Sequence, residues 1–191
     1  MTEADRTSIL LDLAAALRTN GSWTGETHVQ KAAYLMQELL GVPSGFRFVL
    51  YKHGPFSFDL RSLLTRMEVW GGIRLQDQPY PYGPKIVEGE TAGILRSASD
   101  APQTYASRIR FVAEQLGKSN VAELERVATA LFIERDVSVA PDRRNARLTE
   151  LKPHITPEEA SNAFVRLNEI RDAAVARGFT TAGGCFSRSA H

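Results

Sequence analysis

Cysteine is almost absent from this sequence, because Cys185 is the only one among 191 residues. A single cysteine excludes an internal disulfide, and the first residues lack the charged head, apolar run and small-residue cleavage site of a secretory signal. No apolar run approaches the roughly twenty residues that a membrane span requires. We therefore expect a cytoplasmic protein of a reducing compartment, without a membrane partner.

An excess of charge of one sign is also lacking. The chain has 23 basic and 22 acidic side chains, a net charge of +1 and a sequence pI near 7.9. Proteins that bind nucleic acid usually carry a basic excess, so nucleic acid is not a favoured partner. A hydrophobic fraction of 43% and a charged fraction of 24% are ordinary for a globular protein and exclude the disordered and fibrous classes.

Motifs for metals and nucleotides are missing as well. No two histidines have the spacing that places two ligands on one face of a helix, and no cysteine accompanies them. The glycine pairs Gly71-Gly72 and Gly183-Gly184 lack the spacing of a phosphate-binding loop. We expect no metal and no cofactor. The histidines are His28, His53, His154 and His191.

A hydrolytic grouping of His53, Ser57 and Asp59 is the nearest approach to a catalytic motif. A nucleophilic serine needs a base within hydrogen-bond reach, a third group that orients the base, and an oxyanion hole. Ser57 instead stands where the following helix needs a cap, which accounts for it without catalysis. We expect no catalytic residues and no enzymatic activity.

The first half of the chain mixes helical and extended patterns. Apolar residues at helical spacing predict a helix from Thr2 to Asn20. The run Thr27-His28-Val29-Gln30 has the form of a capping box and predicts the start of a second helix, which ends at Gly41. Residues 45–51 are rich in aromatic and β-branched side chains, so they predict a short strand.

The turn Tyr51-Lys52-His53-Gly54-Pro55-Phe56-Ser57 has the most distinctive chemistry in the sequence. Gly54 permits a backbone angle that other residues rarely adopt, and Pro55 is expected to end any strand ladder. Ser57 can cap the helix predicted by the apolar residues from Leu60 to Met67.

A β-hairpin is predicted after this third helix, from Ile73–Gln76 and Lys85–Val87 around a proline-rich tip at residues 78–84. This order of elements is that of a winged-helix module, in which the third helix reads DNA. The outward charges of that helix are balanced in sign, so DNA binding is not favoured. They are Arg61, Arg66, Asp59 and Glu68.

The second half of the chain is predicted to be helical. Residues 101–116 and 121–131 have the spacing of two antiparallel helices joined by a short turn. The stretch from Val137 to Arg147 is predicted to be a long surface loop. Thr156-Pro157-Glu158-Glu159 has the cap, proline and acidic residues of a helix start, and the helix continues through Ile170.

These patterns predict a mainly α (α+β) fold. A winged-helix-like N-terminal half with a short strand and a β-hairpin is expected to pack on a C-terminal helical bundle. We divide the chain into residues 1–98, residues 99–179 and a flexible tail at 180–191. The first two parts are expected to pack as one unit.

Two polar groups have more than one interpretation. Gln30, Lys31, Tyr34 and Glu38 form a stripe on the second helix, which is either a solvated face with aromatic packing or a support for the turn. In the second interpretation Lys31 and Tyr34 donate hydrogen bonds to backbone carbonyls of the turn and fix a surface that a partner reads. The loop cluster Arg143, Arg144 and Arg147 is either solvated or a contact for an acidic surface.

Two of these segments together resemble a known signature. Val29-Gln30-Lys31-Ala32-Ala33-Tyr34-Leu35-Met36-Gln37 and His53-Gly54-Pro55-Phe56-Ser57-Phe58-Asp59-Leu60 are similar to the paired motifs of Panacea-domain proteins, which include the SocA-like antitoxins, and of YwgA-like proteins. The common form is Leu-Gln-Lys-x-x-Tyr followed by Tyr-Gly-Pro-Phe/Tyr-Ser. Val29 and His53 depart from it. A weaker similarity covers Leu124 to Leu131 and Leu151-Lys152-Pro153.

The resemblance implies a non-enzymatic protein-binding module in a toxin–antitoxin or phage-defence locus. Such a module neutralises a toxin by contact or delivers it to a protease, and the expected partner is a protein encoded by a neighbouring gene. The alternative is a DNA-binding transcriptional regulator that uses the winged-helix-like half. The oligomeric state is left open. The candidate partner-binding residues are Gln30, Lys31, Tyr34, Tyr51, Lys52, His53, Gly54, Pro55, Phe56, Ser57 and Asp59.

Overall fold

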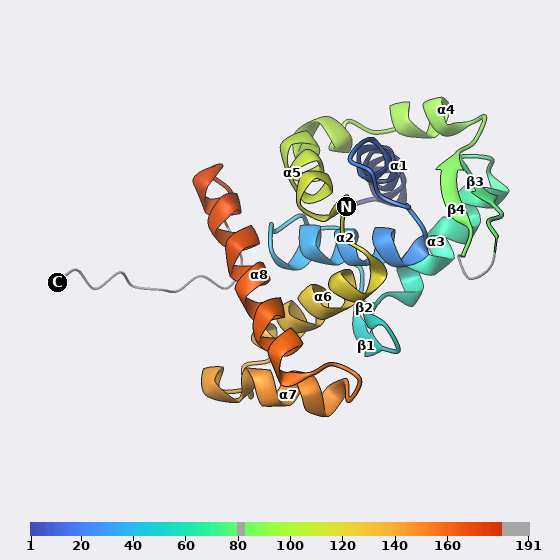
Figure 1. Ribbon diagram of the computed structural model, residues 1–191. Helices are drawn as coiled ribbons and strands as arrows, with labels where there is room; N and C mark the ends of the chain where they lie inside the picture. Colours follow the sequence, from blue (N-terminus) through green and yellow to red (C-terminus); the bar gives the residue numbers. More distant parts are fainter. Residues whose placement is uncertain (80–82, 181–191) are drawn as a thin grey trace.

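A computed structural model describes residues 1–79 and 83–180 of the chain. Part of the predicted hairpin tip, residues 80–82, and residues 181–191 of the predicted tail lie outside the described residues. The described part is mainly helical with two small antiparallel hairpins, which confirms the mainly α (α+β) fold (Figure 1). No helix within the described ranges is long and apolar enough to cross a membrane.

The helices are α1 (Glu3–Thr19), α2 (Glu26–Glu38), α3 (Phe58–Val69), α4 (Ala92–Ser97), α5 (Ala101–Leu116), α6 (Val121–Arg135), α7 (Arg144–Leu151) and α8 (Pro157–Ala176), with a short 3-10 turn at Pro141–Arg143. The strands are β1 (Val49–Tyr51), β2 (Gly54–Phe56), β3 (Ile73–Gln76) and β4 (Lys85–Glu88). Each hairpin is a sheet of its own, β1 with β2 and β3 with β4.

Several helix starts follow their sequence signals. The Thr2 hydroxyl caps α1, and the Thr156 hydroxyl accepts from the backbone of Glu159 at the start of α8. The Ser57 hydroxyl accepts a hydrogen bond from the Leu60 N–H at 3.3 Å, as predicted. These caps satisfy donors that the first turn of a helix leaves free.

The capping box predicted at Thr27 is wrong. The cap residue of α2 is Gly25, two residues before Thr27, and it offers no side chain, so the helix begins at Glu26. Gln30 does not turn back to the helix start, because its amide lies in the interior and pairs with the backbone of Ser57. A long-range contact therefore overrides a local signal.

The expectation that Pro55 ends the strand ladder is also wrong. Strand β2 contains Pro55, which lies opposite Leu50 in an antiparallel register that pairs Tyr51 with Gly54. A proline can occupy a strand whose nitrogen faces away from its partner, and in a two-stranded sheet each strand has such a free edge. The turn therefore belongs to a β-hairpin, β1–β2, that precedes α3.

The β3–β4 hairpin matches the prediction. Strands β3 and β4 are antiparallel, with Ile73 opposite Glu88 and Gln76 opposite Lys85. The Ile86 N–H also donates to the Thr24 carbonyl at 2.9 Å, which joins this hairpin to the connection between α1 and α2. The sequence analysis did not predict α4, a six-residue helix that has no side-chain cap.

Helices α5 and α6 are not the antiparallel pair that the sequence predicts. Helix α5 packs chiefly on α1, and α6 packs on α8 and α2. Figure 1 shows α2 between α5 and α6, and both helices contact it. Helix α2 is buried on nearly all sides, because every residue from His28 to Met36 is buried. It needs apolar neighbours on opposite sides, and α5 and α6 supply them.

The long loop predicted from Val137 to Arg147 is wrong in its second part. The chain forms the 3-10 turn at Pro141–Arg143 and then enters α7. Leu148 is fully buried, and α7 packs on α6 and α8. One apolar face on a short arginine-rich segment is enough for a helix when its neighbours cover that face.

Buried apolar residues from both halves of the chain form one cluster, which extends from Ile9 in α1 to Ala174 in α8. Helices α2 and α6 pass through its middle and meet the β1–β2 hairpin, since β2 contacts both. The division at residues 98 and 179 stays a prediction, while the core itself is shared.

Replacing Gly54 with alanine tests how closely the first hairpin approaches α6. Gly54 has φ of +81°, and an added Cβ would lie 2.9 Å from Thr129 Oγ1 and 3.3 Å from the Glu125 carbonyl oxygen. We expect Gly54→Ala to lower the free energy of unfolding by about 2–4 kcal/mol, measured by urea denaturation.

Gly21→Ala is the matched control. Gly21 has φ of +90°, but an added Cβ would meet no described atom within 4 Å. Only the backbone cost remains, about 1 kcal/mol. Equal losses in the two variants would contradict the close approach of the hairpin to α6.

Candidate functional site

The β1–β2 hairpin is fixed to the core through the amide of Gln30. The Gln30 Nε2 donates to the Ser57 carbonyl at 3.0 Å, and the Ser57 N–H donates to Gln30 Oε1 at 3.0 Å. Both residues are fully buried. The side-chain amide therefore satisfies the Ser57 N–H and is a second donor to the Ser57 carbonyl, which also accepts from the Arg61 N–H at 3.1 Å.

Lys31 supplies a second contact one residue further along α2. Its Nζ donates to the Pro55 carbonyl at 2.8 Å, and its side chain is among the largest that are fully buried. Burial lowers the pKa of Lys31 to about 8, and the nearby Glu125 carboxylate opposes this effect. The predicted hydrogen bond from Lys31 to the turn is confirmed.

Tyr34 does not make the hydrogen bond predicted for it. Its ring instead packs at 4.9 Å, edge to face, on the ring of Phe48 and at 6.5 Å on that of Phe132. Burial raises the pKa of the Tyr34 hydroxyl. Because Gln30, Lys31 and Tyr34 are at most 2% exposed, these three residues do not form a solvated face, whereas the aromatic packing that the same interpretation included is present at Tyr34.

Lys152 reaches the same hairpin from the other half of the chain. It follows the last residue of α7, and its Nζ donates to the carbonyls of Tyr51 at 2.8 Å and Lys52 at 2.6 Å. The same Nζ lies 3.0 Å from Glu125 Oε1, in an ion pair buried at both ends. Thus Lys152 holds the tip of the hairpin while Glu125 balances its charge.

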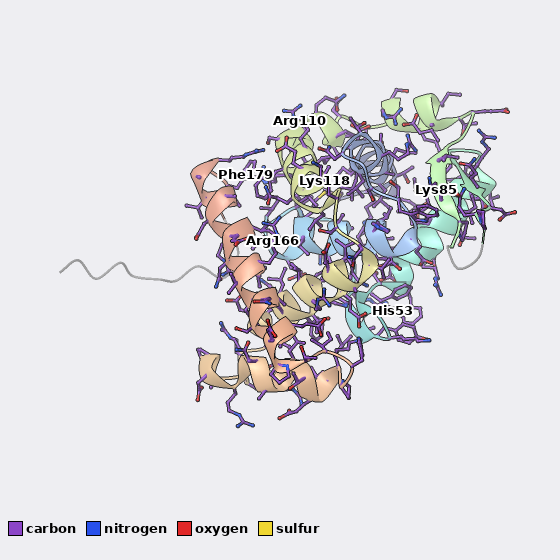
Figure 2. All side chains as sticks on the ribbon, viewed as in Figure 1. His53, Lys85, Arg110, Lys118, Arg166 and Phe179 are labelled. Carbon is purple, nitrogen blue, oxygen red and sulfur yellow. The ribbon has the colours of Figure 1, made fainter. Side chains whose placement is uncertain are left out.

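Glu125 is the centre of a polar cluster on α6. Besides Lys152, its carboxylate lies 3.6 Å from Nδ1 of His53 and 3.5 Å from Nε2 of His154. The two histidines are more than half exposed, whereas Glu125 is buried. Figure 2 shows His53 beside the β1–β2 hairpin. The carboxylate therefore joins the buried lysines to the solvent-facing tip.

Sequence reasoning gave no role to Glu125 and Lys152. The weaker family similarity covers both segments, but it assigns them no function. One signal was present: Glu125 lies beside Leu124 and three residues before Ala128, on the inward side of α6. A carboxylate in that position requires a buried cation. Nothing in the sequence identifies Lys152 as that cation.

Three aromatic rings from the hairpin and the start of α3 lie against one another, and we call them the aromatic cluster: Tyr51, Phe56 and Phe58. Their ring centroids are 5.1 to 5.8 Å apart. Tyr51 is 54% exposed and Phe58 is 53% exposed, whereas Phe56 is buried beneath them. The guanidinium of Arg61 lies 4.8 Å from the Phe56 ring centroid. The cluster is thus an apolar surface in contact with solvent.

The candidate residues form two layers. Tyr51, Lys52 and His53 are exposed at the hairpin tip, and Asp59 is partly exposed and lies 3.3 Å from Arg47. The other candidate residues are buried, and they support the hairpin from beneath. They are Gln30, Lys31, Tyr34, Gly54, Pro55, Phe56 and Ser57. The structure brings all of them together at one hairpin.

The Arg143, Arg144 and Arg147 cluster is paired within the chain. Arg143 and Arg147 lie 3.6 Å and 3.2 Å from the carboxylate of Glu150. Arg144 lies 3.1 Å from Glu134, which also pairs with an arginine of α8. Each of the three cations therefore lies beside an acid of the chain, but Arg143 and Arg147 share Glu150, and Arg144 shares Glu134 with the α8 arginine.

An apolar groove of about 940 Å³ adjoins the aromatic cluster. Its walls come from α3, the β3–β4 hairpin, the start of α2 and the turn before α6, and they include Leu64, Ile73 and Ile86. Arg61 forms a two-bond ion pair with Glu26, at 2.8 Å and 3.0 Å, and both residues line the groove. This pair separates the groove from the aromatic cluster.

Replacing Lys31 with methionine tests the buried ammonium. Folding lowers the pKa of Lys31 from 10.5 to about 8, so between these values the unfolded state binds a proton that the folded state has released. Stability from this group therefore rises with pH in that window, and the cost of the buried charge is fully present below it. In Lys31→Met this dependence is absent.

We expect the free energy of unfolding of the natural protein, minus that of Lys31→Met, to increase by about 2 kcal/mol from roughly pH 7.5 to pH 9.5. Urea denaturation at several pH values measures it. Lys118→Met, which alters an exposed lysine, should run parallel to the natural protein. A parallel curve for Lys31→Met would show that the buried amine is not responsible.

Comparison with known proteins gave no match, either to a family model or to a curated protein. The resemblance to the Panacea-domain and YwgA-like motifs therefore rests on the residues of the chain itself. In the structure these residues hold one hairpin, with Gln30 and Lys31 of the first motif bound to Ser57 and Pro55 of the second.

Proposed function

We propose that this protein is a non-enzymatic interaction module of the antitoxin or phage-defence accessory type, which binds a toxin to neutralise it or to deliver it to a protease. One observation carries the proposal: the aromatic cluster is exposed on a hairpin whose backbone is held by buried side chains. The partner is a protein encoded by a neighbouring gene.

The chemistry of the aromatic cluster suits a protein interface. Tyrosine, phenylalanine and arginine are enriched where proteins bind one another, and binding energy concentrates on a few such residues. Tyr51 and Phe58 expose about half of their surface, and Arg61 lies beside them against Phe56. The adjoining groove gives a partner a recess for apolar side chains.

Anchoring of the hairpin favours tight binding. Side chains and loops that become ordered on association reduce affinity, so a surface that is already ordered loses less. Here Gln30, Lys31 and Lys152 fix the carbonyls of Tyr51, Lys52, Pro55 and Ser57 before any partner arrives.

The family resemblance supports the same surface. The glutamine and lysine of the first motif hold the Gly-Pro-Phe-Ser turn of the second, so the two motifs describe one structural unit. Phe56 and Phe58 of the second motif then belong to the aromatic cluster. In the proposed function the motifs serve to build a contact surface, and no catalytic group is needed.

A DNA-binding regulator is the alternative, favoured by the β3–β4 hairpin that follows α3 in the order of a winged helix. Two outward arginines of α3 are, however, engaged within the chain. Arg61 pairs with Glu26, and Arg66 lies 2.6 Å from Glu3. Cations that are already paired contribute less to phosphate binding, so this alternative ranks second.

Phe58→Asp tests the proposed function. Phe58 is the first residue of α3, where an acidic side chain is compatible with the helix dipole, so the variant should fold. The protein is co-expressed with the product of its adjacent gene, and affinity capture and growth are measured. We expect the natural chain to co-purify and restore growth, and Phe58→Asp to bind at least about tenfold more weakly.

Ile94→Asp is the matched control, because Ile94 is 72% exposed and lies in the first turn of α4, away from the hairpin. It should bind like the natural chain. Wild-type binding by both variants would remove the aromatic cluster from the interface. If no complex forms and the chain instead binds its own promoter with strong salt dependence, the regulator replaces the proposed function.

A further inference from the structure

We infer that the partner segment that contacts the β1–β2 hairpin is acidic as well as apolar, with a carboxylate next to its apolar anchor. This inference rests on the proposed function, since it specifies the chemistry of the partner at the same surface. The basis for the inference is the positive charge at the hairpin tip, which a negatively charged segment would complement.

The first component of the charge is buried beneath the tip. Lys31 and Lys152 both direct their ammonium groups to carbonyls of the hairpin, and Glu125 is the buried carboxylate that accompanies them. Two ammonium groups and one carboxylate leave an excess positive charge. Charges that are removed from water act at longer range than exposed ones, so this excess is felt at the tip.

The second component is exposed on the tip itself. Lys52 is exposed and its ammonium makes no ion pair within the described part of the chain. The neighbouring arginines differ, because Arg47 lies against Asp59 and Arg61 lies against Glu26. These two pairs cancel, which leaves Lys52 as the free cation beside the aromatic cluster.

The charged side chains that lie on the hairpin, or bind to it or to the aromatic cluster, carry a net positive charge together with their ion-pair partners. The basic side chains are Lys31, Arg47, Lys52, Arg61 and Lys152, and the acidic ones are Glu26, Asp59 and Glu125. Five basic against three acidic groups give a net charge of +2, whereas the whole chain carries only +1. His53 and His154 also face Glu125 and add no negative charge.

The apolar and the charged contacts are adjacent. Tyr51 precedes Lys52 in the chain, and its ring lies 5.8 Å from that of Phe58. A partner that covers Tyr51 and Phe58 with apolar side chains therefore brings its flanking residues to Lys52. A carboxylate there is attracted, and an ammonium is repelled.

A single-stranded nucleic acid also combines aromatic stacking with negative charge. It carries a phosphate on every nucleotide and needs several free cations along its path. The hairpin offers Lys52, while its two exposed arginines are paired with carboxylates. One free cation beside an apolar cluster matches a carboxylate-bearing protein segment better than a phosphate chain.

Lys52→Glu tests the inference, with Arg110→Glu as the control for the same change of charge. Arg110 is exposed on α5 and makes no ion pair among the described residues, and Figure 2 shows it well away from His53 at the hairpin. The dissociation constant of the complex with the adjacent-gene product is measured by titration calorimetry at about 50 mM and about 500 mM salt.

We expect Lys52→Glu to weaken binding by roughly tenfold or more at the lower salt concentration and by much less at the higher one. Arg110→Glu should change binding less than about twofold. If Phe58→Asp abolishes binding while Lys52→Glu and salt have no effect, the proposed function stands and the acidic segment is wrong.

Two further outcomes overturn the inference. If the natural chain binds no adjacent-gene product, the proposed function and the inference fail together. If a single-stranded DNA oligomer binds the natural chain, competes with the protein partner and loses affinity in Lys52→Glu, the negatively charged ligand of the tip is nucleic acid.

Discussion

The buried hydrogen bonds from side-chain ammonium and amide groups to the backbone of the β1–β2 hairpin are the interaction on which the rest of the site depends. A hairpin of two three-residue strands is marginal in water by itself. Here Gln30 and Lys31 donate to the carbonyls of Ser57 and Pro55, as a neighbouring strand would, and Lys152 donates to carbonyls at the tip. The position of Tyr51 and Phe58 follows from this support, because their backbone is already fixed.

The support is electrostatically costly. Lysines are almost never fully buried, and a buried ion pair rarely adds stability compared with an apolar replacement. Lys152 lies within ion-pair distance of the Glu125 carboxylate, whereas the Lys31 ammonium is bound to the Pro55 carbonyl. Such a cluster defines one geometry, since each donor has one set of acceptors at the right distance. A contact surface benefits from this definition more than an ordinary core does.

Local chemistry made much of the fold predictable, and long-range contacts account for the errors. The caps at Ser57 and Thr156 depend on residues three positions away, and each forms as predicted. The capping box at Thr27 fails because the Gln30 amide is bound to Ser57, 27 residues further on. Pro55 remains in a strand because its nitrogen faces away from β1, on the free edge where its carbonyl accepts from Lys31. At the candidate site, the sequence identified the motif residues of α2 and the turn. It did not predict the pairing of Glu125 with Lys152, because the two residues lie in different elements that only the fold brings together.

The contact between Lys152 and the hairpin joins residues about one hundred positions apart in the chain. As the protein is synthesised, the aromatic rings and the first motif emerge long before the residue that closes their support. Until α7 has formed and placed Lys152 beside Glu125, the carbonyls of Tyr51 and Lys52 lack this donor. The support of the aromatic cluster is therefore completed late, although the cluster itself lies in the first third of the chain.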